Sequence, residues 1–134
     1  MTSAIVVADP DPNPNAPPTI DPSGTVPGGQ RGQWLEINYA TLVAATGAAP
    51  ASRSLEFILN SVTSGTLQIW TGSRWVAPPS FGKLPIPVNL MGPGGKIRWM
   101  PAANASGKTP AFVVSLWDGR LKSGLCQVSV QVAP

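Results

Sequence analysis

The segments that decide the fold lie toward the end of the chain and read KIRWM (96–100), AFVVSLW (111–117) and CQVSVQV (126–132). The first and third alternate between polar and apolar residues, as do strands with one buried face. The middle segment is almost wholly apolar, which is typical of a strand covered on both faces. A tight-turn dipeptide, Asp118-Gly119, follows it. These segments therefore predict three successive strands separated by turns.

The same alternation continues upstream, where Gly, Pro and Ser punctuate short apolar segments. A small-residue stretch at 39–45 predicts a single helical turn, and no longer helix is expected. In all, about seven regularly spaced strands are predicted, which indicates an all-β chain folded as a β-sandwich. The further predicted strands are 34–39, 55–59, 66–70, 74–76 and, at a sheet edge, 86–90.

The first thirty residues differ from the rest in composition. They hold seven prolines and three acids but no Lys or Arg, so their formal charge is −3. Prolines at this density favour an extended chain over helix or sheet. We therefore predict two parts, an extended Pro-rich arm at 1–30 and a β-sandwich domain at 31–134. Two interpretations of the arm stay open: a disordered tail or linker, or an arm lying along a neighbouring subunit, with Ile5, Val6 and Val7 as an apolar anchor or added strand.

The chemical inventory argues against catalysis. The chain has no histidine, six acids and a single cysteine, Cys126, so neither a general base nor a zinc cluster is readily assembled. Asp118 is expected to accept backbone hydrogen bonds in its turn. Cys126, aligned with core valines, is expected to be a buried small hydrophobe. We predict no enzyme activity, no cofactor and no metal site.

Charge and hydropathy limit the classes of partner and the location that we expect for this chain. Nine bases and three acids give residues 31–134 a formal charge of +6, but the bases are scattered singly, so no specific nucleic-acid binding is expected. No segment approaches the roughly 20 apolar residues of a membrane span, and no secretory signal is visible. If Met1 is the natural start, the protein is expected to be made and kept in the cytoplasm, or to leave it only within a larger assembly.

Five tryptophans are many for 134 residues. Trp99 is in phase with Ile97 and is predicted to lie in the core, whereas Trp70 and Trp75 are predicted to be exposed. Such a pair could anchor a protein interface, where tryptophan is enriched, or stack on sugar rings. The Pro- and Gly-rich segment 77–95 is predicted to add a contact surface. The predicted partner-binding residues are thus Ile5, Val6, Val7, Trp70, Trp75, Phe81 and Leu84.

From Trp34 onward, the order of short segments resembles the cadherin-like repeats of large bacterial surface proteins. The matching segments are LEINYATL (35–42), LEF (55–57), VTSGTL (62–67), RWMPAANASG (98–107), AFVV (111–114), WDG (117–119) and VSVQV (128–132). The resemblance implies an Ig-like sandwich used for structure or adhesion. Family members often carry an acidic loop that suits calcium, but GAAPASRS (47–54) has no carboxylate. We therefore predict that this chain binds no calcium.

Low charge, the arm and the spare tryptophans favour a structural subunit of a virion, by fold analogy. This would be a decoration or cement protein of a phage capsid, or a head or tail component. Its partners would be the major capsid protein or copies of itself, in a homo-oligomer or larger assembly located in the virion. Two alternatives stay open. The first is a repeat of a secreted or cell-surface bacterial adhesin, and the second is a carbohydrate-binding module.

Overall fold

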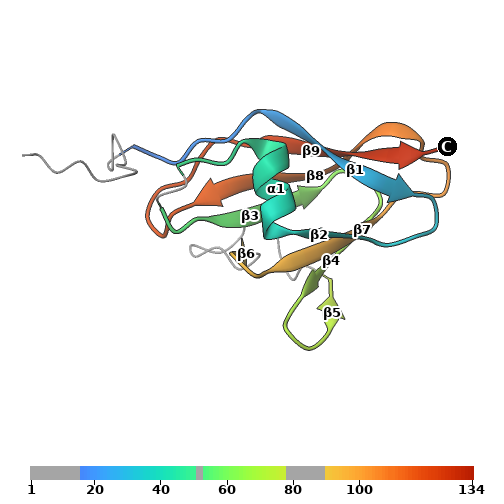
Figure 1. The fold of residues 1–134 in the computed structure, drawn as a ribbon, viewed down its shortest axis with the longest axis horizontal. Helices are drawn as coiled ribbons and strands as arrows, with labels where there is room; N and C mark the ends of the chain where they lie inside the picture. The colour runs from blue at the N-terminus through green and yellow to red at the C-terminus, as the bar shows by residue number, and fades with distance from the viewer. Residues whose placement is uncertain (1–15, 51–52, 78–89) are drawn as a thin grey trace, which may run out of the picture.

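The computed structural model describes residues 16–50, 53–77 and 90–134. In these ranges two sheets face each other, with one short helix at their edge (Figure 1). The elements are β1 (Ser23–Gln30), β2 (Leu35–Asn38), α1 (Tyr39–Thr46), β3 (Glu56–Val62), β4 (Thr66–Trp70), β5 (Trp75–Val76), β6 (Leu90–Met91), β7 (Lys96–Met100), β8 (Gly107–Trp117) and β9 (Cys126–Ala133). The larger sheet has the order β1-β9-β8-β3-β6 and the smaller one β2-β7-β4-β5. The predicted all-β sandwich is confirmed.

The predicted strands lie close to the observed ones. Seven strands in the described residues have four or more residues, and β5 and β6 have two each. β6 begins at Leu90, the last residue of the edge strand predicted at 86–90, and residues 86–89 lie outside the described part of the chain. β6 pairs with β3 at the end of the larger sheet, which agrees with an edge position.

The apolar run at 111–117 forms the second half of β8. This strand pairs antiparallel with β9 on one side and with β3 on the other. Consecutive residues Val114, Ser115 and Leu116 are all buried, so both faces of this part of the strand are covered. Its interior position accounts for the absence of the polar alternation that marks half-buried strands.

The smaller sheet packs its inner face against the larger one. β7 pairs antiparallel with both β2 and β4, and one row across the three strands contains Leu35, Trp99 and Leu67. The Trp99 ring is fully buried, and its indole N–H donates to the carbonyl of Ser64 at 2.8 Å. The neighbouring Gly65 has a φ of +72°, and a Cβ there would lie 2.9 Å from that ring. The turn before β4 thus needs glycine both for its backbone and for its contact with Trp99.

The expected boundary between arm and sandwich at residue 31 is wrong. β1 occupies residues 23–30, pairs in parallel with β9 and places Val26 in the core at 2% exposure. A proline is tolerated here because β1 is an edge strand and Pro27 lies where the register with β9 shifts, so the missing N–H breaks no ladder. Thr19 also pairs with Ala49. The part of the expected arm that lies outside the described residues is 1–15, which includes Ile5, Val6 and Val7.

The helix is longer than the single turn predicted at 39–45. Asn38 caps α1, because its side-chain oxygen accepts the N–H of Thr41 at 2.8 Å. Gly47 ends the helix in the left-handed region, and its N–H donates to the carbonyl of Val43. α1 packs beside β1 and β2 and closes that edge of the sandwich (Figure 1). Among the described residues, no helix has the length and apolar character to cross a membrane.

Candidate binding surface

The outer face of the smaller sheet carries a cluster of tryptophans and cations. Because Ile97 and Trp99 of β7 point into the core, Lys96 and Arg98 point to the opposite face. Gln68 of β4 lies directly opposite Arg98, and Trp75 of β5 lies opposite the last residue of β4. We call this surface the tryptophan face, and its members are Trp34, Trp70, Trp75, Lys96 and Arg98, flanked by Glu36 and Gln68.

Trp70 and Trp75, predicted as an exposed pair, do lie together. Their ring centroids are 5.2 Å apart and the rings are inclined at 56°. The ammonium nitrogen of Lys96 lies 5.0 Å from the centroid of Trp70 and 5.6 Å from that of Trp75. These distances are within the range of cation–π attraction. Both rings are half-buried rather than fully exposed, because they cover each other and the Lys96 side chain.

Arg98 joins the third tryptophan to this pair. Its guanidinium carbon lies 4.2 Å from the ring centroid of Trp34 and 4.6 Å from that of Trp75. Two guanidinium nitrogens, Nε and Nη2, donate to Oε1 of Gln68 at 2.9 and 2.6 Å. The bidentate bond fixes the plane of the guanidinium, so Arg98 holds aromatic rings from two separate segments in one arrangement.

The tryptophan face has a small excess of positive charge. Lys96 pairs with Glu36 at 3.4 Å, and this pair is solvated, with side-chain exposures of 37% and 60%. Arg98 has no carboxylate partner among the described residues, where its hydrogen bonds go to Gln68. In the same part of the chain, no acceptor meets the indole N–H of Trp34, Trp70 or Trp75. Within the described residues, the face thus combines three indole donors without an acceptor and one cation without a carboxylate.

Sequence reasoning found only part of this surface. It named Trp70 and Trp75, but it missed the involvement of Trp34, Lys96 and Arg98. The alternation in KIRWM did place both cations on one face of a strand. It did not reveal that β5 and the residue before β2 bring tryptophans to that face. The other predicted partner-binding residues, Ile5, Val6, Val7, Phe81 and Leu84, lie outside the described residues.

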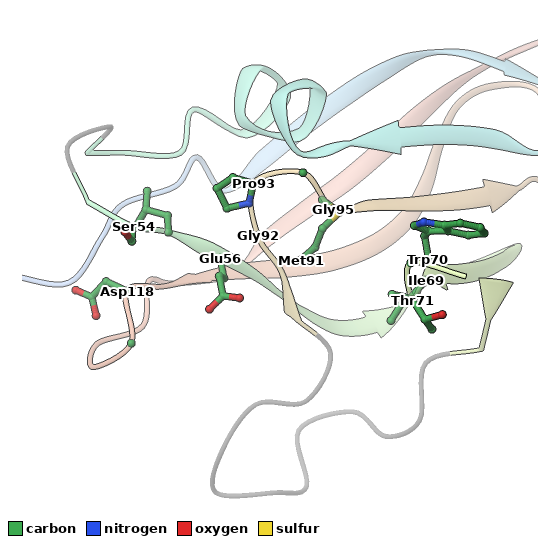
Figure 2. A pocket seen from close by; sticks show the side chains of 14 residues that line it. Ser54, Glu56, Ile69, Trp70, Thr71, Met91, Gly92, Pro93, Gly95 and Asp118 are labelled. Carbon is green, nitrogen blue, oxygen red and sulfur yellow. The ribbon is translucent and has the colours of Figure 1, made fainter. Parts of the chain in front are cut away.

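A second candidate is a groove of about 700 Å³ between the edges of the two sheets. Figure 2 shows Asp118 at one end, Trp70 and Thr71 at the other, and Glu56 between them. Asp118 is already engaged, because its Oδ1 accepts the N–H groups of Arg120 and Leu121 and its Oδ2 pairs with Arg53 at 3.2 Å. The predicted turn role of Asp118 is confirmed.

The pKa values of Asp118, at the end of the groove, and of Cys126, in the core, are both shifted from their ordinary values. The hydrogen bond from the N–H of Leu121, with help from Arg120 and Arg53, lowers the pKa of Asp118 against the opposing effect of burial. Burial raises the pKa of the Cys126 thiol, which is fully enclosed in the core as predicted. Within the described ranges, no three residues of the His, Cys, Asp and Glu types gather in a way that could hold a metal ion.

Comparison with known proteins assigns no family. No family model matches the chain, and no curated protein matches it. Among solved structures, the chain is similar to the ASH/PapD-like domain of human CEP192 (PapD-like domain 7). The identity is 14% over 98% of this chain and 96% of that one, with a TM-score of 0.35. A likeness this distant assigns neither a function nor a partner.

Proposed function

We propose that this chain is a non-enzymatic structural protein that joins a larger protein assembly through its tryptophan face. The observation that carries the proposal is the gathering of Trp34, Trp70, Trp75 and Arg98 on one outer face of a sheet. Tryptophan and arginine are the residue types that most often dominate the energy of protein interfaces. A β-sheet also holds them in a fixed arrangement, which lowers the entropy lost on binding.

The ring geometry favours a protein partner over a sugar. A sugar platform needs open, roughly coplanar ring faces, whereas Trp70 and Trp75 are inclined at 56°. Lys96 and Arg98 also lie over ring faces that a sugar would need. The indole N–H groups of these rings, which meet no acceptor among the described residues, suit the carbonyls of a protein.

Within this proposal, the assembly is a virion. The chain would be a decoration or cement subunit of a phage capsid, or a head or tail component, with the major capsid protein or its own copies as partners. Three features support this: a charged fraction of only 11%, an acidic proline-rich N-terminal segment, and the tryptophan face. The resemblance to cadherin-like repeats favours a different location, a bacterial adhesin at the cell surface, and the two proposals differ in the oligomeric state they predict.

The test is the mass of the full chain, measured by light scattering from about 10 µM to about 1 mM, a range that spans weak association. We expect a closed oligomer that Trp75→Ala weakens. Leu125→Ala is the matched control, because Leu125 is a large hydrophobic residue, 62% exposed, on the loop before β9 rather than on the tryptophan face. A monomer at every concentration would count against the assembly and favour the adhesin repeat. Equal weakening by both variants would count against the tryptophan face as the interface.

A further inference from the structure

The tryptophan face has the chemistry of a surface that binds proline-rich chains. Such chains adopt the polyproline II conformation, whose carbonyls make no internal hydrogen bonds. Proteins recognise them with grooves lined by aromatic rings, between which the proline rings pack. Here three half-buried tryptophans lie on one outer sheet face, Trp34 just before β2, Trp70 at the end of β4 and Trp75 at the start of β5. Their indole N–H groups meet no acceptor within the described part of the chain. Those donors match the free carbonyls of such a ligand.

The chain itself contains a ligand of this kind. Residues 1–15 read MTSAIVVADPDPNPN, with prolines at every second position from Pro10 to Pro14. Asp9 precedes this run and Asp11 lies within it, and the segment contains no Lys or Arg. Its charge is therefore opposite to the excess on the tryptophan face, where Arg98 has no carboxylate partner among the described residues.

We infer that the tryptophan face of one copy binds residues 1–15 of a second copy, with the prolines against the outer edges of the indole rings and the aspartates beside Arg98 and Lys96. This inference rests on the proposed function and specifies the contact between subunits. In this arrangement the acidic segment of each copy binds the tryptophan face of the next copy.

The position of Ala16 argues for a second copy rather than the same one. Arg53 donates to the carbonyl of Ala16 and pairs with Asp118, so the described chain starts at the Asp118 end of the groove. Trp70 lies at the opposite end, with Glu56 between them (Figure 2). A segment that turned back from Ala16 toward its own tryptophan face would pass the carboxylate of Glu56, which repels Asp9 and Asp11.

The experiment is a complementation between two full-length variants, followed by light scattering. The double variant Asp9→Lys/Asp11→Lys reverses the charge of the segment, and Arg98→Glu reverses the charge at the centre of the tryptophan face. Each variant alone should self-associate at least about tenfold more weakly than the wild type, because like charges then meet. An equal mixture should recover a complex, because the intact segment of one variant meets the intact face of the other. Lys108→Glu, an exposed charge reversal on β8, should behave as wild type.

A competition measurement on the wild-type protein tests the same contact without a face variant, which could misfold. A synthetic peptide of residues 1–15, added to the wild-type oligomer, should dissociate it and change the tryptophan emission. The same peptide carrying both Asp-to-Lys substitutions should do neither. These two results, together with complementation, support the inference.

The remaining outcomes overturn it and separate it from the proposed function. If the wild type self-associates and both variants do so equally well, the assembly stands and docking of the segment fails. If the peptide binds but the mixture forms no complex, the segment occupies its own face rather than a neighbour's. If the wild type is monomeric throughout and the peptide changes nothing, the proposed self-assembly fails as well.

Discussion

The two faces of the smaller sheet use tryptophan in opposite ways. On the inner face, Trp99 is 0% exposed, and its indole N–H, the only polar group of the side chain, donates to the carbonyl of Ser64. On the outer face, Trp34 and Trp75 are half-buried and contact Arg98, and their indole donors meet no acceptor among the described residues. The inner ring is fully satisfied by the fold, whereas the outer rings are those to which we assign the proposed contact with a partner. Under this proposal, the face on which the strand places a tryptophan decides whether the ring stabilises the fold or contacts a partner.

The strongest test of this contrast is Trp99→Ala. Removing a fully buried aromatic ring should lower the free energy of unfolding by about 3–5 kcal/mol, because a cavity replaces it and the carbonyl of Ser64 loses its donor. Urea unfolding followed by far-UV circular dichroism measures the loss without relying on tryptophan emission. A loss below about 1 kcal/mol would mean that the ring does not hold the core as the structure indicates.

For charged side chains too, the loss in free energy of unfolding should be larger at an enclosed position than at a solvated one. Asp118→Ala should cost about 2 kcal/mol, because two backbone N–H groups and Arg53 lose their acceptor. The Arg53–Asp118 pair is 12% and 9% exposed, whereas the Lys96–Glu36 pair is 37% and 60% exposed. Glu36→Ala is therefore the control and should cost at most about 0.5 kcal/mol.

The pH dependence of the Asp118→Ala effect provides a second measurement. Hydrogen bonding, chiefly from Leu121, lowers the pKa of Asp118 in the folded state. A lowered pKa means that the carboxylate stabilises the fold fully above about pH 4 and loses this effect as the pH falls through the folded-state pKa. The difference between wild type and Asp118→Ala should therefore shrink in acid. A constant difference down to about pH 2 would contradict the assignment.

Trp75→Ala should have a modest effect on stability and a large one on association. The ring loses contacts with Trp70, Lys96 and Arg98, which together should contribute about 1 kcal/mol at a half-exposed site. Unfolding in urea measures this loss, and light scattering measures the association of the same sample. A stability loss as large as that of Trp99→Ala would remove the distinction between the two faces.

The smallest expected effect is that of Arg98→Lys. The charge remains, but the planar stacking against Trp34 and the bidentate bond to Gln68 are lost. We expect the free energy of unfolding to fall by less than about 1 kcal/mol. The midpoint of thermal unfolding and the tryptophan emission maximum are suitable readouts. An unchanged emission spectrum would indicate that the guanidinium does not order the rings.

Sequence patterns predicted the inner face well. The alternation in KIRWM was sufficient to place Ile97 and Trp99 in the core, because a strand sends successive side chains to opposite sides. The strand β1 was missed because Pro27 argues against a sheet unless its edge position and the local register shift are known. The tryptophan face was found only in part for a related reason. Cross-strand neighbours depend on register, and the register between β7, β4 and β2 is set by the whole fold rather than by any one segment.

The parallel pairing of β1 with β9 also affects how the protein folds. Ser23 lies beside Gln127, so one of the main sheet ladders joins segments about a hundred residues apart. Contacts over such separations close large loops before they gain any stabilisation, and proteins rich in them fold slowly. During synthesis, β1 emerges from the ribosome long before its partner exists, and the larger sheet stays incomplete until β9 has emerged. The first strand of the sandwich is therefore expected to be among the last to pair in the sheet.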